Sequence, residues 1–155
     1  MKQLILAVTI FFTFMTFSFS QTNAETQNEQ EAIKRLIQTC YIEGMANNGD
    51  FEKMNIIFHP DFIMTGLSKE KKMWKWNYTR LQDYYETEKS KGNIPLTEDN
   101  KITAKYITID VIGYLALVKL EIYHGTELAY IDYLNLFKFE DGWKIISKTF
   151  YNVPE

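Results

Sequence analysis

The clearest evidence for the architecture of this 155-residue chain lies in its last third, where residues 102–153 read ITAKYITIDVIGYLALVKLEIYHGTELAYIDYLNLFKFEDGWKIISKTFYNV. β-Branched and aromatic residues dominate this segment with a period of two, which is typical of strands. Three turn signals, Gly113, Gly125-Thr126 and Asp141-Gly142, divide it into strands over 102–112, 114–124, 127–140 and 143–153. Connections this short join antiparallel neighbours, so the sequence predicts a meander of four long strands.

Helical periodicity precedes the meander. Apolar residues recur at intervals of three and four from Ile33 to Met45, which predicts a helix with one continuous apolar face. Asp50 and Asn77 have the positions of N-caps, before a second and a third helix. In order, we expect a helix over 33–45, a short helix over 51–58, a hairpin of 62–67 with 72–76, and a helix over 78–91. Three helices, a hairpin and a meander in a chain of this length predict one α+β domain.

The first twenty residues have the three parts of a secretory signal peptide. Lys2 supplies the charge, residues 4–14 form the apolar run, and Ser18 and Ser20 are the small residues before the cleavage position. The apolar stretch is shorter than the roughly 20 residues that a membrane-spanning helix needs. We therefore expect cleavage after Ser20, export to the periplasm or the extracellular space, and no membrane span in the mature chain. The mature chain would consist of a polar tether over 21–30 and a domain over 31–153.

Composition excludes several classes of protein. The net charge of −3 argues against nucleic-acid binding, because that affinity comes largely from Lys and Arg side chains on phosphates. A single cysteine, Cys40, excludes an internal disulfide and a Cys-rich metal site, and two histidines leave little for a His-based one. A hydrophobic content of 46% excludes a disordered chain. We expect neither a metal nor a cofactor.

Three local motifs accompany this order of elements: Phe58-His59-Pro60-Asp61, residues 131–138 (IDYLNLFK) and residues 141–150 (DGWKIISKTF). Together with the order of helices and strands, they resemble the nuclear transport factor 2-like (NTF2-like) superfamily, and within it the branch called "putative lumazine-binding". The resemblance covers about 29–152. It implies a cone-shaped α+β fold in which three helices cover a curved antiparallel sheet, an interior that holds the polar residues, and a homodimer formed through the sheet. The superfamily includes ketosteroid isomerases, dehydratases, cyclases and non-enzymatic binding domains, so the resemblance does not choose among functions.

Turn lengths predict which residues share a face of the sheet. A two-residue loop at Gly125-Thr126 places Lys119 opposite Asp132, and the loop at 141–142 places Asp132 opposite Tyr151. One face then mixes aromatic rings with paired charges, and the other is mainly apolar. Two interpretations stay open: the mixed face lines a pocket inside the cone, or it meets solvent and the apolar face is the core. In the first, the candidate ligand-binding residues are Tyr41, Phe62, Met64, Tyr84, Tyr85, Lys119, Glu121, Tyr123, Tyr130, Asp132 and Tyr151.

Three functional hypotheses follow. The favoured one is an exported, dimeric protein that binds a small apolar or aromatic molecule inside the cone, without assigned catalysis. The second is an enzyme of the ketosteroid-isomerase, dehydratase or cyclase type. In that enzyme Asp132 acts as general acid or base, and Tyr130 donates a hydrogen bond to a developing oxyanion. The third is a dimeric structural or partner-binding module whose interior is filled.

Overall fold

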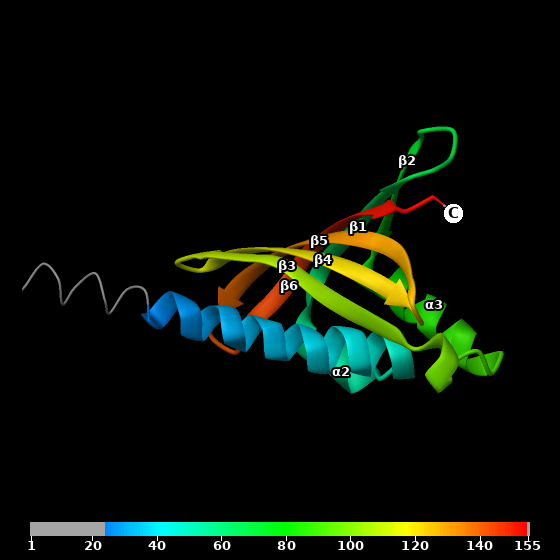
Figure 1. Cartoon of the computed structure of the whole chain (residues 1–155), viewed down its shortest axis with the longest axis horizontal. Helices are drawn as coiled ribbons and strands as arrows, with labels where there is room; N and C mark the ends of the chain where they lie inside the picture. Colours follow the sequence, from blue (N-terminus) through cyan, green and yellow to red (C-terminus); the bar gives the residue numbers. More distant parts are fainter. Residues whose placement is uncertain (1–23, 155) are drawn as a thin grey trace, which may run out of the picture.

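The computed structural model describes residues 24–154, so the predicted signal peptide and the start of the predicted tether lie outside the described part of the chain. A long helix over 24–48 lies along one face of a six-stranded sheet (Figure 1), and its second half is the π-helix η1 (Ile37–Asn47). The other elements are α2 (Phe51–Ile57), β1 (Phe58–Leu67), β2 (Met73–Asn77), α3 (Tyr78–Ser90), η2 (Glu98–Asn100), β3 (Ile102–Ile112), β4 (Leu115–His124), β5 (Glu127–Phe139) and β6 (Gly142–Asn152). Among the helices of 24–154, none is both long and apolar enough to cross a membrane.

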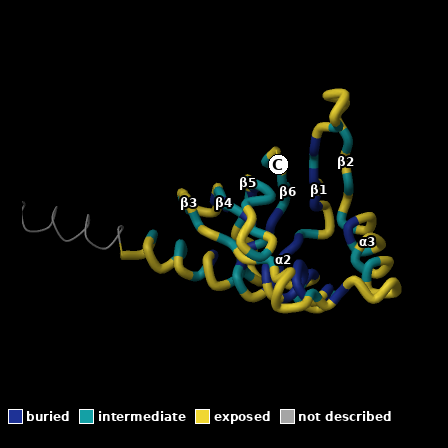
Figure 2. The backbone as a smooth tube through the Cα atoms, turned by 45° about the vertical axis from the view of Figure 1, so that its right-hand side comes forward, coloured by how far each residue is buried: buried dark blue, intermediate teal, exposed yellow. Residues whose placement is uncertain are grey.

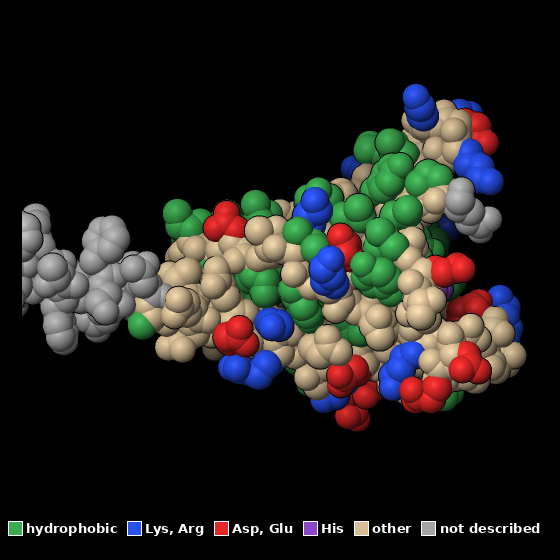
Figure 3. Space-filling model, viewed as in Figure 1, with side chains coloured by type: hydrophobic (Ala, Val, Ile, Leu, Met, Phe, Trp, Pro, Cys, Tyr) green, Lys and Arg blue, Asp and Glu red, His purple; other side chains and the backbone are tan. Residues whose placement is uncertain are grey.

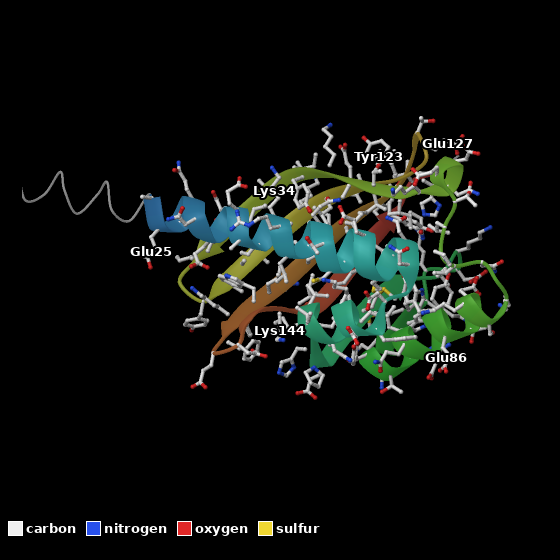
Figure 4. All side chains as sticks on the ribbon, turned by 90° about the horizontal axis from the view of Figure 1, so that it is seen from below. Glu25, Lys34, Glu86, Tyr123, Glu127 and Lys144 are labelled. Carbon is white, nitrogen blue, oxygen red and sulfur yellow. The ribbon has the colours of Figure 1, made fainter. Side chains whose placement is uncertain are left out.

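The strands follow the order β2-β1-β6-β5-β4-β3 in a curved, open sheet. The strands of the meander are antiparallel neighbours, as their short loops predict, whereas β1 and β6 run parallel and make the sheet mixed. Long twisted strands curl, and the curled sheet is covered on one side. Seen from below, the long helix lies across that side with α2 and α3 beside it (Figure 4). This is the predicted α+β cone.

The first helix starts earlier than the sequence pattern predicts. Residues 24–30, expected to be part of a loose tether, are helical and bonded to the sheet. The Glu29 carboxylate accepts hydrogen bonds from Trp143 Nε1 and Lys138 Nζ, each at 2.7 Å. Gln30 Nε2 donates to the carbonyl oxygen of Ile109 at 2.7 Å. These polar contacts hold a helical turn that has little apolar periodicity of its own, which corrects the predicted tether.

A bulge in β5 changes the predicted register of the meander. His124 lies opposite Glu127, as the turn length predicts, but the register shifts directly afterwards and leaves Ala129 without a partner on β4. Asp132 therefore lies opposite Leu120 instead of Lys119. It lies opposite Phe150 of β6 instead of Tyr151 for a separate reason: Phe139 already pairs with Gly142 at the turn, and a second bulge leaves Ile146 of β6 without a partner on β5. One extra residue turns every later side chain of a strand to the other face relative to its neighbour. The predicted sorting of faces is wrong from this point.

The core lies between the concave face of the sheet and the long helix (Figure 2). Ile33 and Ile37 from the helix meet Leu120 and Leu134 from the sheet, and all four are fully or almost fully buried. Cys40 lies in the same cluster, and its burial raises the pKa of the thiol. The concave face is thus apolar at the centre of the meander. The polar side chains of this concave face lie toward one end of the sheet.

Candidate functional site

A pocket of about 500 Å³ opens at one end of the cone, between the sheet, the long helix, the β1–β2 hairpin and α3. Aromatic side chains form a large part of its wall. Trp74 and Trp76 come from β2, Phe150 from β6, and Trp76 packs against Tyr84 with ring centroids 5.6 Å apart. A pocket of this size and lining is typical of small-molecule sites. Six of the predicted residues line it: Tyr41, Phe62, Met64, Tyr84, Tyr85 and Tyr130.

Four of the predicted residues do not reach the pocket. All four lie on the outer, convex face of the sheet: Lys119, Glu121, Tyr123 and Tyr151. The bulge in β5 separates the three residues of β4 from the face of Asp132, and the bulge at Ile146 of β6 does the same for Tyr151. Glu121 accepts hydrogen bonds there from Tyr123 Oη at 2.8 Å and from Lys105 Nζ at 3.1 Å. Lys119 lies over the ring of Tyr133. The contacts of Glu121 with Lys105 and of Lys119 with Tyr133 are cross-strand pairs on the convex face.

Asp132 lies inside the cone, fully buried, as the pocket interpretation requires. Its partner is Lys148 of β6, whose ammonium group donates to Asp132 Oδ2 at 2.6 Å. The Tyr41 hydroxyl donates to the same carboxylate oxygen at 2.6 Å, and Lys148 also donates to Tyr41 Oη. Tyr41 and Lys148 line the pocket, so this buried cluster forms part of its floor.

The pocket is electrically balanced. Burial, reinforced by the negative charge of Asp132, raises the pKa of Tyr41 well above its usual value, and burial raises the pKa of Tyr85 in the same direction. Both phenols therefore stay protonated and act as neutral hydrogen-bond donors or acceptors. The charges of Lys148 and Asp132 cancel at the floor. The lining also includes Glu88, whose carboxylate is paired with Lys91 at 2.9 Å.

The floor keeps unused hydrogen-bonding capacity. An ammonium group has three donors, and Lys148 uses two of them within the cluster. Asp132 Oδ1 is buried and accepts no hydrogen bond from any residue of the described chain, 24–154. Leaving a buried carboxylate oxygen unpaired is unfavourable. The cluster can therefore bind a ligand through one charged donor and holds a second, unsatisfied acceptor beside it.

Sequence reasoning missed Lys148, although a signal for it exists. In the period-two pattern of β6, Lys148 stands between Ile146 and Phe150, on the face that the turn lengths predict to be mainly apolar. A lysine at such a position needs a buried partner, and this requirement points to an ionic site. The register that would have named Asp132 as the partner depended on the bulge at Ile146 of β6.

The comparisons with known proteins agree with this fold. The sequence matches the family described as "Putative lumazine-binding" over residues 28–151. It matches no curated protein. An NTF2-like protein of unknown function from Shewanella baltica OS155 is 22% identical with a TM-score of 0.66, over 83% of this chain and 96% of that one. One from Silicibacter pomeroyi DSS-3 is 18% identical with a TM-score of 0.67, over 83% and 98%.

An NTF2-like protein from Cytophaga hutchinsonii ATCC 33406 is 16% identical with a TM-score of 0.60, over 81% of this chain and 98% of that one. At these identities the solved structures establish the fold alone, whereas the family match spans most of the chain. The chain belongs to the family described as "Putative lumazine-binding", and it has the fold of NTF2-like proteins.

Proposed function

We propose that this protein binds a small, electrically neutral molecule with an aromatic or apolar body in the pocket inside the cone. The observation that carries the proposal is the buried Tyr41–Asp132–Lys148 cluster on the floor of an aromatic pocket. The family description points the same way, because lumazine is a small heteroaromatic molecule.

The charge balance argues for a neutral ligand. A carboxylate ligand would add an uncompensated negative charge next to Asp132, and a cationic one would compete with Lys148 for the same oxygen. A neutral molecule that offers an acceptor, such as a carbonyl oxygen, would take the remaining Lys148 hydrogen without changing the net charge. The walls would then bury the rest of its surface against rings.

Native mass spectrometry of the chain from residue 21 onward tests this function, because it reports a co-purified ligand and the number of subunits together. Displacement of the neutral dye Nile red then measures binding in the pocket. The variant Lys148→Met/Asp132→Asn removes both charges together, and we expect it to bind the co-purified molecule at least about tenfold more weakly, the loss of one charge-assisted hydrogen bond. Lys119→Met, on the outer face, is the matched control. Equal affinities for both variants would contradict the proposal.

A second candidate function is proton transfer by Asp132. The observation that favours it is the free oxygen of a fully buried carboxylate beside a pocket, with Tyr41 as a neutral donor and Tyr130 in the wall. In an isomerase, dehydratase or cyclase, Asp132→Asn would abolish turnover and leave ligand binding largely intact. If the variant binds and turns over as the unmodified protein does, the carboxylate only shapes the pocket.

The proposed function includes export. The support is the sequence of residues 1–20, with its charged start, apolar run and small residues before the cleavage position. Expression in a bacterial host followed by N-terminal sequencing of the periplasmic fraction tests it. Protein that stays in the cytoplasm with Met1 intact would exclude export in that host.

We also propose a homodimer formed through the convex face of the sheet. The support is a set of large side chains that stay about half exposed on this face, Leu117, Tyr133 and Tyr151. Analytical ultracentrifugation of the unmodified protein and of Tyr133→Lys tests the proposal, and we expect the variant to sediment as a monomer. A monomeric unmodified protein would refute it.

A further inference from the structure

The hairpin of β1 and β2 projects beyond the body of the protein (Figures 1 and 2). Residues 69–72 at its turn are exposed, and the last cross-strand pair before the turn is Leu67 with Met73. Leu67 is 61% exposed and Met73 is 65% exposed. Single exposed apolar side chains are normal on a protein surface. Adjacent ones at the end of a projecting hairpin are instead typical of a contact surface.

Positive charge surrounds this apolar pair. Lys69, Lys71 and Lys72 lie in the turn and Lys75 follows on β2, against one acidic residue, Glu70. The segment 67–75 therefore carries a net charge of +3 in a chain of net −3, so the remainder carries −6. Within the described part of the chain, none of these four lysines is in an ion pair. Figure 3 shows the basic side chains at the end of the hairpin, above a group of hydrophobic ones.

We propose that this end of the hairpin, which we call the hairpin tip (Leu67, Met73 and the four lysines), docks on the surface of an anionic lipid membrane. The apolar pair would enter the boundary between headgroups and acyl chains. The lysines would place their aliphatic stems along that boundary and their ammonium groups on the lipid phosphates.

Other occupants fit the hairpin tip less well. A second copy of this chain in a two-fold contact would bring two segments of charge +3 together, which repel. A nucleic acid is recognised through aromatic rings that stack on its bases or through arginine contacts, and the tip offers neither an exposed aromatic ring nor an arginine. A membrane surface accepts the apolar and the basic side chains at once.

Docking at this place would bring the pocket close to lipid. Trp74 and Trp76 occupy the other face of β2, and both line the pocket together with Leu67. The same hairpin would thus touch the membrane through Met73 and the lysines and form the pocket wall through Trp74 and Trp76, with Leu67 at the boundary between the two surfaces. A ligand of low water solubility would pass between the membrane and the pocket along this apolar surface. This last step rests on the proposed function, whereas membrane docking itself does not.

Vesicle co-sedimentation tests the docking. The protein tested is the chain from residue 21 onward, which keeps every residue of the core. It lacks residues 4–14, because that apolar run would bind lipid by itself. Vesicles contain phosphatidylcholine alone or with about one third phosphatidylglycerol, an anionic lipid. We expect binding to the anionic vesicles only, and its loss at about 1 M salt, where the Debye length is about 3 Å.

Two variants and a control identify the surface. Each lysine near an anionic membrane contributes about fivefold in affinity, so Lys69→Gln/Lys71→Gln/Lys72→Gln should bind about 100-fold more weakly. Leu67→Ser/Met73→Ser should lower affinity by about tenfold or more. The control, Lys34→Gln/Arg35→Gln/Lys119→Gln, removes the same charge from sites outside the hairpin and should bind as the unmodified protein does.

Equal weakening by the hairpin and control triples would mean that only net charge matters, and this would overturn the proposal. Absence of binding by the unmodified protein would overturn it as well. So would a change of oligomeric state in the hairpin triple, because the tip would then contact a second copy. Native mass spectrometry of the same variants reports pocket occupancy separately, so a failed docking test and a failed ligand test are distinguishable.

Discussion

Replacement of Lys148 by methionine tests whether the floor of the pocket is held by charge. The substitution keeps the length and much of the volume of the side chain and removes its ammonium group. Lys148 Nζ lies 2.6 Å from Asp132 Oδ2, and the two side chains are 14% and 1% exposed. At an effective dielectric constant of about 20, charges at this distance attract by about 6 kcal/mol before the cost of burying them is subtracted. Breaking one side of a buried pair lowers the free energy of unfolding by about 3–5 kcal/mol, because the other charge stays buried without a partner.

We therefore expect Lys148→Met to lower the free energy of unfolding by about 3–5 kcal/mol, measured by urea denaturation followed through tryptophan fluorescence. The melting temperature should fall by roughly 10–20 °C for a domain of this size. The double variant Lys148→Met/Asp132→Leu removes both charges, and it should recover to within about 1 kcal/mol of the unmodified protein, since apolar replacement of a buried pair is often neutral.

Lys119→Met is the matched control on the outer face. This variant loses only the contact of Lys119 over the ring of Tyr133, so its free energy of unfolding should fall by about 0.5–1 kcal/mol. A loss below about 1 kcal/mol for Lys148→Met would refute the reasoning. A double variant no more stable than the single one would refute it too, because the deficit would then come from packing and not from an unpaired charge.

Three further predictions concern other parts of the molecule. Hydrogen bonds from Lys138 and Trp143 lower the pKa of Glu29 below its ordinary 4.5. These bonds therefore stabilise the folded protein fully above pH 4.5, and the stabilisation is lost as the pH falls through the lowered pKa. Glu29→Gln should thus lower the free energy of unfolding by about 1 kcal/mol at neutral pH and by less in acid, while exposed Glu31→Gln should change little in pH-dependent melts. Burial raises the pKa of the Cys40 thiol, so iodoacetamide should label it only after unfolding, and labelling of the native protein at the rate of a free thiol would contradict its burial. A Cβ at Gly66 would overlap the indole of Trp74, so Gly66→Ala should displace this ring and weaken Nile red binding severalfold, whereas unchanged binding would show that Trp74 is not part of the wall that the dye contacts.

Much of the architecture could be predicted because it is encoded locally. The strands of 102–153 follow from the period-two pattern, and the tight turns make them antiparallel. The caps at Asp50 and Asn77 are where the sequence places them, and each side chain accepts hydrogen bonds from backbone N–H groups of the following turn. The helix before residue 31 could not be predicted, because Glu29 and Gln30 are held by distant residues and not by a local apolar pattern.

The site was predicted in part, and two bulges, at Ala129 of β5 and at Ile146 of β6, account for the wrong pairings. The pocket interpretation placed Asp132, Tyr41 and the aromatic rings of Phe62, Tyr84, Tyr85 and Tyr130 inside the cone. It did not include Trp74, Trp76 or Phe150, and it expected Lys119 as the partner of Asp132. The structure places Lys148 there instead.

The sequence by itself determined the type, order and turns of the elements, because those depend on the periodicity and conformational preferences of neighbouring residues. Only the tertiary structure decided which side chains meet inside the cone. The bulge at Ala129 leaves one residue of β5 without a partner on β4, and the hydrophobic pattern of the sequence does not reveal it. It nevertheless exchanges the two faces of the strand relative to its neighbour. The bulge at Ala129 turned Lys119 away from Asp132, and a second bulge at Ile146 of β6 brought Lys148 to the face of Asp132.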